Sequence, residues 1–270
     1  MIRLVLLGTV HRDPSGKRKL TAAIENIRPS AISLEVSPAS VRLRKESGRE
    51  WMILFKKRLG LLAREMGRSP GELMGLASLR GVFEYIRLPY EYRAALEFAD
   101  RNGAPMFLLD ESKTAEDFLG RVKSEILTRA NMALLAHHDD GATLDQDVRA
   151  QYIRARTMVL RHKPGPAPLV RDLEEWKKRE TALAQKLRLL HQGLARRAGR
   201  TMSGAELAAG LVIAPEAVGL LPLTVTFPLE PVHLYIGGWE HLTETEEQLD
   251  MYSHLRDLSP EKRLCPWNAD

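Results

Sequence analysis

Short apolar runs alternate with longer amphipathic segments along the chain, and several of these runs end abruptly in a polar or charged residue. The runs occupy residues 4–7, 31–34, 106–109 and 232–236. Each is too short for a buried helix and shows no helical period, so each predicts a buried strand. Apolar side chains recur at helical spacing over residues 20–27, which predicts a helix that ends by Pro29. This strand–helix–strand unit favours parallel pairing of its two strands with a right-handed crossover.

Two helical stretches separate the strand candidates. Residues 41–85 have one apolar face, with basic residues on the other faces. The apolar face consists of Trp51, Met52, Leu54, Phe55, Leu59 and Leu62. Basic amphipathic helices lie on membranes or bind partner peptides, but apolar stripes most often face a core, which favours a lid packed over the sheet. Residues 113–200 form the second stretch, and its leucine seam has Glu180 in one position, where a carboxylate must be paired or near solvent.

The order of these elements predicts an α/β fold, with a mostly parallel sheet, flanking helices and a long helical insertion. We expect a single α/β domain over residues 1–270. Within it, residues 41–85 form the lid-like segment and residues 113–200 the helical insertion.

Shorter segments add detail to this prediction. The Pro-Gly-Pro-Ala-Pro sequence of residues 164–168 indicates a linker. The prolines that bound residues 222–231 favour a short edge strand there. A capping box over residues 243–246 predicts the start of a final helix. The polar tail beyond Pro260 is uninformative and neither predicts nor excludes a further element.

Composition excludes several classes of protein. Hydrophobic residues make up 44% of the chain and charged residues 28%, as in globular proteins. No apolar run approaches the ~20 residues of a membrane span, and none forms a signal-peptide core, so we expect a cytoplasmic protein without a transmembrane segment, for which peripheral membrane contact stays open. The net charge is +5, but the most basic stretch, residues 149–200, has no aromatic interleaving or reader motif, so nucleic-acid binding is not expected. The single cysteine, Cys265, excludes an internal disulfide and a cysteine zinc site.

The strand candidates end in groups that bind metals or transfer protons. A Gly-x-x-His sequence follows a strand twice, ending at His11 and at His241, and Glu35 ends the second strand. Open α/β sheets bind ligands at the carboxyl ends of their strands, so we expect these three side chains in one cleft. Two neutral imidazoles and a carboxylate form an open site for a divalent ion that activates water. A second carboxylate, Asp110 or Glu240, is then the candidate general base.

Each of these residues also has a purely structural interpretation, because polar residues after strands often satisfy loop backbone groups. We expect His233 in the core, since it lies inside a strand, and His137 and His138 on the surface, since they lie in a polar turn. If the site is functional, replacing His11 or His241 with alanine abolishes activity with little loss of stability, because functional sites sacrifice stability.

Four segments resemble signatures of the TraB/PrgY–GumN–Tiki family, whose members look like distant relatives of erythromycin esterase and the haem-binding ChaN proteins. The segments are LLGTVHRDPSG, PSAISLEVSP, RNGAPMFLLDES and LYIGGWEHL. A fifth segment, WKKRETALAQKL, is weakly similar to a family helix whose arginine faces the site, which implies that role for Arg179. This segment has Glu180 where the family usually has a polar amide. The resemblance does not extend to residues 41–85 or 118–168.

The resemblance implies an α/β core with a helical insertion and, for the Tiki branch, a metal-dependent peptidase. The implied metal ligands are His11, Glu35 and His241, and the wider catalytic group adds Asp110, Glu240 and Arg179. The resemblance favours Mn or Co, and Zn also suits these ligands. The predicted function is therefore metal-assisted hydrolysis of a peptide or related acyl bond.

Two alternatives to a metal-dependent hydrolase stay open at the level of the sequence. A His–Glu pair without a metal activates water by itself, as the likeness to erythromycin esterase suggests. The second alternative is a non-catalytic regulatory protein, in which the same cleft binds a metal, haem or a signal peptide.

Overall fold

The computed structural model describes residues 2–138, 143–160, 173–211, 215–243 and 251–265. A six-stranded sheet lies at its centre, in the order β5-β3-β2-β7-β1-β8. The strands are β1 (Arg3–Thr9), β2 (Ala31–Leu34), β3 (Met106–Leu108), β5 (Val218–Leu220), β7 (Val232–Gly238) and β8 (Glu261–Leu264). All neighbours pair in parallel except β3 and β5, which pair antiparallel at one edge. The predicted α/β fold with a mostly parallel sheet is confirmed.

Strand β7 lies between β1 and β2, so the predicted direct pairing of the first two strands is wrong. Within β7, His233 is the register partner of Leu4 on one side and of Ala31 on the other. Strands that are consecutive in the sequence are adjacent in space only roughly two-thirds of the time. The insertion of β7 places the second Gly-x-x-His sequence between the ends of the two strands that carry His11 and Glu35.

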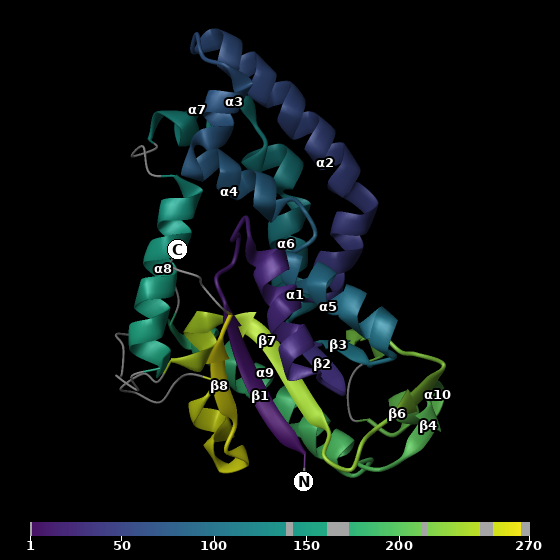
Figure 1. Cartoon of the computed structure of the whole chain (residues 1–270). Coiled ribbons are helices and arrows are strands. Elements are labelled where there is room, and N and C mark those ends of the chain that lie inside the picture. The colour runs from purple at the N-terminus through teal and green to yellow at the C-terminus, as the bar shows by residue number, and fades with distance from the viewer. Residues whose placement is uncertain (1, 139–142, 161–172, 212–214, 244–250, 266–270) are drawn as a thin grey trace.

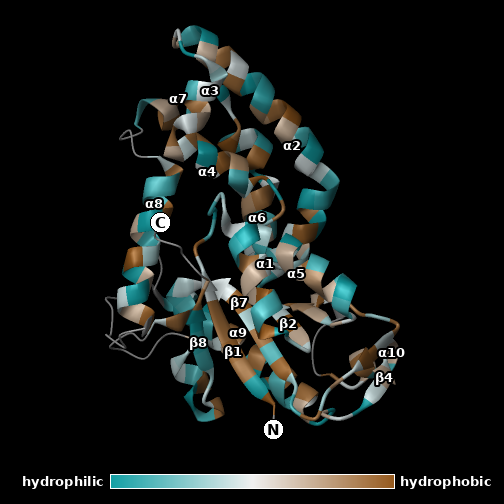
Figure 2. Ribbon diagram, in the orientation of Figure 1, coloured by the Kyte–Doolittle hydropathy of each residue, from teal (hydrophilic) through white to brown (hydrophobic). Residues whose placement is uncertain are grey.

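Helices cover both faces of the sheet, and their apolar positions face it. Helices α1 (Gly16–Ile27) and α5 (Tyr90–Asn102) lie over one face, and α9 (Leu173–Ala195) lies behind the other (Figure 1). Helix α8 (Leu144–Ala155) packs at the side near β8. Figure 2 shows hydrophobic residues along β1 and β7, two long strands that lie inside the sheet and are covered on both faces.

Five helices form a separate layer over the carboxyl ends of the strands, which we call the cap (Figure 1). They are α2 (Pro38–Glu65), α3 (Pro70–Gly75), α4 (Ala77–Tyr85), α6 (Ser112–Gly120) and α7 (Arg129–His137). Helix α2 begins at a favourable sequence, because the Ser37 side chain accepts a hydrogen bond from the Ser40 amide and Pro38 takes the first helical position. The cap has its own apolar core, which buries Trp51, Phe55 and Leu59 of α2.

Several segments near the C-terminus differ from the prediction. The polar tail beyond Pro260, for which the sequence made no prediction, contains β8, which pairs with β1 along the edge of the sheet. The expected edge strand is β6 (Thr224–Thr226), which pairs with β4 (Thr201–Ser203) in a separate small sheet beside α10 (Gly204–Ala209). The expected linker at 164–168 and the start of the final helix after residue 243 lie outside the described residues. No helix in the described part of the chain is long and apolar enough to cross a membrane.

Candidate functional site

The three residues singled out by the strand ends lie together at one edge of the sheet. His11 follows β1, Glu35 directly follows β2, and His241 lies in a short 3-10 turn (Trp239–Leu242) after β7. The register pairs Thr9 with Gly238, and Leu34 with Ile236, so the three strands end at nearly the same level. His241 Nε2 is 2.8 Å from Glu35 Oε1, and His11 Nε2 is 3.8 Å from Glu35 Oε2.

Glu35 is the centre of this group, and its carboxylate is buried. Oε1 contacts His241 Nε2 and accepts a 2.5 Å hydrogen bond from Arg179 Nη2, while Oε2 accepts the Gly238 amide at 2.7 Å. Burial alone would raise the pKa of Glu35, but His241, Arg179 and His11 outweigh it and hold that pKa well below its ordinary value. Glu35 is therefore a carboxylate at neutral pH.

His241 is held between two carboxylates. Its Nδ1 lies 2.6 Å from Oε1 of Glu180, in an ion pair that is not aligned as a hydrogen bond. The other Glu180 oxygen accepts the Met251 amide at 3.0 Å. Burial would lower the pKa of His241, but Glu35 and Glu180 raise it well above the ordinary value, so the ring is an imidazolium. The prediction that the carboxylate in the α9 seam must be paired is confirmed.

His11 is bound on one side and open on the other. Its Nδ1 lies 3.0 Å from Oε1 of Glu91, a buried carboxylate in the first turn of α5 that also accepts the Thr9 hydroxyl at 3.2 Å. Half of the His11 side chain is exposed. Burial by the surrounding walls opposes the charge, but Glu91, Glu35 and Glu240 raise the pKa of His11 to about 9.

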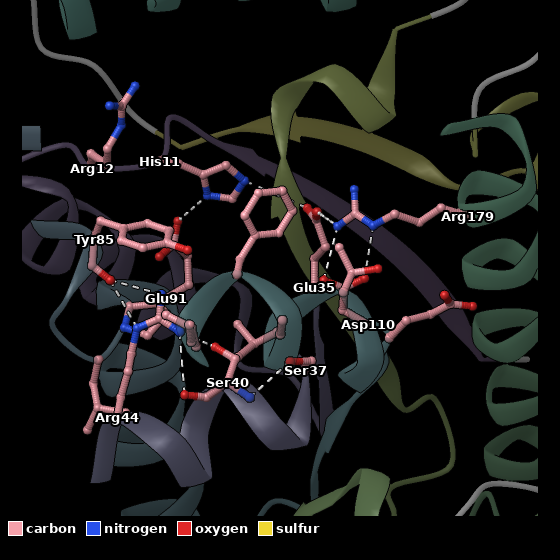
Figure 3. Close-up of a pocket in the computed structure, with 18 of the residues that line it drawn as sticks. His11, Arg12, Glu35, Ser37, Ser40, Arg44, Tyr85, Glu91, Asp110 and Arg179 are labelled. Carbon is pink, nitrogen blue, oxygen red and sulfur yellow. Dashed lines mark hydrogen bonds and ion pairs between the residues drawn. The ribbon is translucent and has the colours of Figure 1, made fainter. Parts of the chain in front are cut away.

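Arg179 joins Glu35 to the end of the next strand. Its Nε and Nη2 donate to the two oxygens of Asp110, at 3.0 and 3.1 Å, in a two-pronged contact. Figure 3 shows its third nitrogen pointing away from both carboxylates. The arginine thus faces the site, as the resemblance implied, and Asp110 contacts Arg179 without reaching either of the two histidines in the described structure.

The two glycines that end β7 let the carboxylates approach the backbone. A side-chain carbon at Gly238 would lie 2.9 Å from both His11 Nε2 and Glu240 Oε2, and one at Gly237 would lie 3.0 Å from Glu35 Oε2. Neither position therefore accepts a larger residue without moving the site. The same distances place the Glu240 carboxylate on the His11 side of the cluster.

A cavity of about 900 Å³ opens above the cluster, between the sheet and the cap. His11 and Glu35 line its floor, and Figure 3 shows Arg44 and Ser40 of α2 on the wall opposite Arg179. Cavities of this size at the carboxyl ends of parallel strands are the usual place for ligands in α/β proteins.

The sequence did not identify Glu91 as a member of the site. It lies in the first turn of a helix, where an acidic residue is ordinary, so no sequence signal marked it. His233 is fully buried against His191 and Ser33, as its place in a strand predicted. His137 and His138 are exposed, also as predicted, and the Cys265 thiol is buried.

The geometry does not fit the expected metal ligands. Both nitrogens of His241 lie against carboxylates, Glu35 and Glu180, and Nδ1 of His11 lies against Glu91. The surrounding carboxylates raise the pKa of both rings, so a metal ion would have to displace a proton from each nitrogen it binds. Among the described residues, no three His, Cys, Asp or Glu side chains are grouped to hold a metal ion. His241 therefore offers no open nitrogen to Mn, Co or Zn in this arrangement, whereas Nε2 of His11 is open to the cavity.

Calorimetric titration with Mn²⁺, Co²⁺ and Zn²⁺ tests the metal directly. We expect each ion to bind the wild type no more tightly than His11→Ala at pH 7, because it would have to displace imidazole protons beside the Arg179 guanidinium. Tight binding that the variant loses, and that weakens as the pH falls, would reinstate the metal centre.

Comparison of the chain with protein-family models, curated proteins and solved structures finds no match. The proposed chemistry therefore depends on the geometry of the site.

Proposed function

We propose that the protein is a hydrolase that cleaves an acyl bond with a His11–Glu91 pair, without a metal in the reaction. The observation that carries this proposal is the geometry of His11. Its Nδ1 is held at 3.0 Å by a buried carboxylate, while its Nε2 faces the cavity. A carboxylate on Nδ1 fixes the tautomer that leaves Nε2 able to take a proton, which is the arrangement that hydrolases use to activate a nucleophile.

The reaction begins with the fraction of His11 that is neutral. Its Nε2 removes a proton from a water molecule in the cavity, and the water oxygen attacks the acyl carbon. The developing negative charge falls on the acyl oxygen, and the free N–H groups of Arg179 are the nearest cationic donors to stabilise it. His11 then returns its proton from Nε2 to the leaving oxygen or nitrogen, which balances the protons of the cycle.

Glu35 and His241 act behind this pair. Glu35 holds Arg179 and lies 3.8 Å from His11 Nε2, where its charge stabilises the imidazolium that forms during attack. His241 compensates the buried charge of Glu35 from the other side. The proposal keeps the hydrolase that the resemblance to the TraB/PrgY–GumN–Tiki family implied, in its metal-free form.

One observation favours a second candidate, a binding protein that does not turn its ligand over. A His11 pKa of about 9 leaves most of the ring protonated at neutral pH, where it attracts an anion more readily than it removes a proton. Turnover of a panel of esters, amides and short peptides in the presence of a chelator decides between the two. Binding without any turnover would favour the regulatory protein.

The pH profile tests the role of Glu91. In the wild type we expect kcat/KM to rise about tenfold per pH unit and to level off near pH 9, because only neutral His11 acts as the base. Glu91→Gln removes the main carboxylate partner, so the His11 pKa falls by about 1–3 pH units and the profile moves with it. Imidazole NMR titration measures the same pKa without a substrate.

Glu97 provides the matched control, since it lies on the same helix but pairs with Lys17 at the surface. Glu97→Gln leaves the His11 pKa unchanged. A wild-type rate that falls through pH 9 would show that protonated His11 is the active form and would contradict the general-base role.

The protonated His11 ring also contributes to the stability of the fold below its unfolded pKa of 6.5, and that contribution is lost as the pH rises through about 9.

A further inference from the structure

The wall of the cavity opposite Arg179 carries a guanidinium with only neutral partners. Arg44 donates from Nε and Nη2 to the Tyr85 carbonyl, at 3.1 and 2.9 Å, and from Nη1 to Ser40. Within the described structure, no carboxylate lies within ion-pair distance of it. Two other arginines that line the cavity, Arg179 and Arg87, each pair with an acid.

Burial makes this uncompensated charge unusual. Arg44 is partly buried, and the loss of water lowers its pKa even though Glu91 acts in the opposite direction. A guanidinium removed from water costs free energy unless a counter-charge accompanies it. The anion that would balance Arg44 is therefore expected to come from the occupant of the cavity.

The charges of the rim support this assignment. Arg12 and Lys178 also line the cavity, are exposed, and have no ion-pair partner in the described residues; Glu111 and Glu175 are the exposed acids there. Arg12 is held in the left-handed region at φ 66° by the turn after β1, a conformation that is strained for a residue other than glycine. Arg44, Arg12 and Lys178 are therefore three cations of the cavity lining without an ion-pair partner in the described residues.

The remaining wall is apolar and partly aromatic. Tyr85, Leu88, Phe118 and Trp176 line the cavity, and Phe118 keeps 53% of its surface exposed. Large apolar side chains that remain open at a cavity mouth are typical of ligand-binding surfaces. An occupant that satisfies both walls has one anionic group and one apolar or aromatic group.

We propose that the substrate of this site is an amphipathic acyl compound with a single carboxylate, which Arg44 binds while the apolar group packs between Tyr85, Phe118 and Trp176. Calling this ligand a substrate rests on the proposed hydrolase. The binding of its carboxylate by Arg44 does not depend on that proposal. A monoanion fits better than a phosphate dianion, because Glu84, Glu91 and Glu111 also line the cavity and would repel the second charge.

The experiment compares N-benzoyl-phenylalanine with its carboxamide, which keeps the shape and removes the charge. We expect calorimetry to give the carboxylate about 10–100-fold tighter binding to the wild type, as for a charge-assisted hydrogen bond. Arg44→Gln abolishes this difference, and Arg44→Lys retains part of it. Arg42→Gln, a change on the same helix at an exposed arginine that pairs with Glu116 outside the cavity, preserves it.

The outcomes separate the two proposals. Equal binding of acid and amide by the wild type would overturn the inference, and this comparison needs no variant to fold. Tighter binding of phenyl phosphate than of the carboxylate would overturn the claim that the site prefers a monoanion. Selective binding of the carboxylate without hydrolysis would leave the inference standing and contradict the hydrolase. Hydrolysis of the acid and the amide with equal KM would contradict the inference and leave the hydrolase standing.

Discussion

His11→Ala is expected to lower kcat/KM by about 10²–10⁴-fold, the usual contribution of a positioned general base. The melting temperature is expected to fall at neutral pH, but less than in His241→Ala, because the change removes the ion pair with Glu91 while half of the His11 side chain is exposed and water can replace it. The measurements are steady-state kinetics on a substrate from the acyl panel and thermal unfolding of the same preparations.

His137→Ala is the control, since His137 is exposed on the cap and has no role in the cavity. It is expected to match the wild type in both measurements. A large loss of stability in His11→Ala, together with full activity per folded molecule, would show that His11 only caps the loop after β1. That result would remove the proposed hydrolase.

His241→Ala is expected to behave differently and to lower the free energy of unfolding by about 3–5 kcal/mol, as when one partner of a buried ion pair is removed. The variant leaves Glu180 and Glu35 buried with less positive charge, and both side chains are 6% exposed or less. For a domain of this size the melting temperature should fall by roughly 10 °C. The expectation from the sequence alone, that either histidine could be replaced with little loss of stability, is thereby revised for His241.

A double variant isolates the cause. Glu180→Leu restores the leucine spacing of the α9 seam and removes the uncompensated carboxylate, so His241→Ala with Glu180→Leu should unfold at higher temperature than His241→Ala alone. Equal stability of the single and double variants would show that the ion pair contributes nothing and that the loss comes from the cavity left by the ring.

The sequence by itself determined the elements that depend on near neighbours. β2 spans the predicted residues 31–34, and α1 ends at Ile27, before the predicted stop at Pro29, because apolar periodicity and bounding prolines act within a few residues. The chemistry at the strand ends was equally local, which is why His11, Glu35 and His241 could be named as one group before their distances were known.

Only the tertiary structure decided how these elements meet. The place of β7 between β1 and β2, and the pairing of β8 with β1, depend on contacts that no local pattern encodes. The same holds for the partners of the site, since Glu91 lies 80 residues from His11 and Arg179 lies 144 residues from Glu35. Those distant carboxylates and cations fix the protonation of the histidines. The sequence therefore supplied the types of side chain at the site, whereas only the folded chain shows the charges that surround the two imidazoles and raise their pKa values.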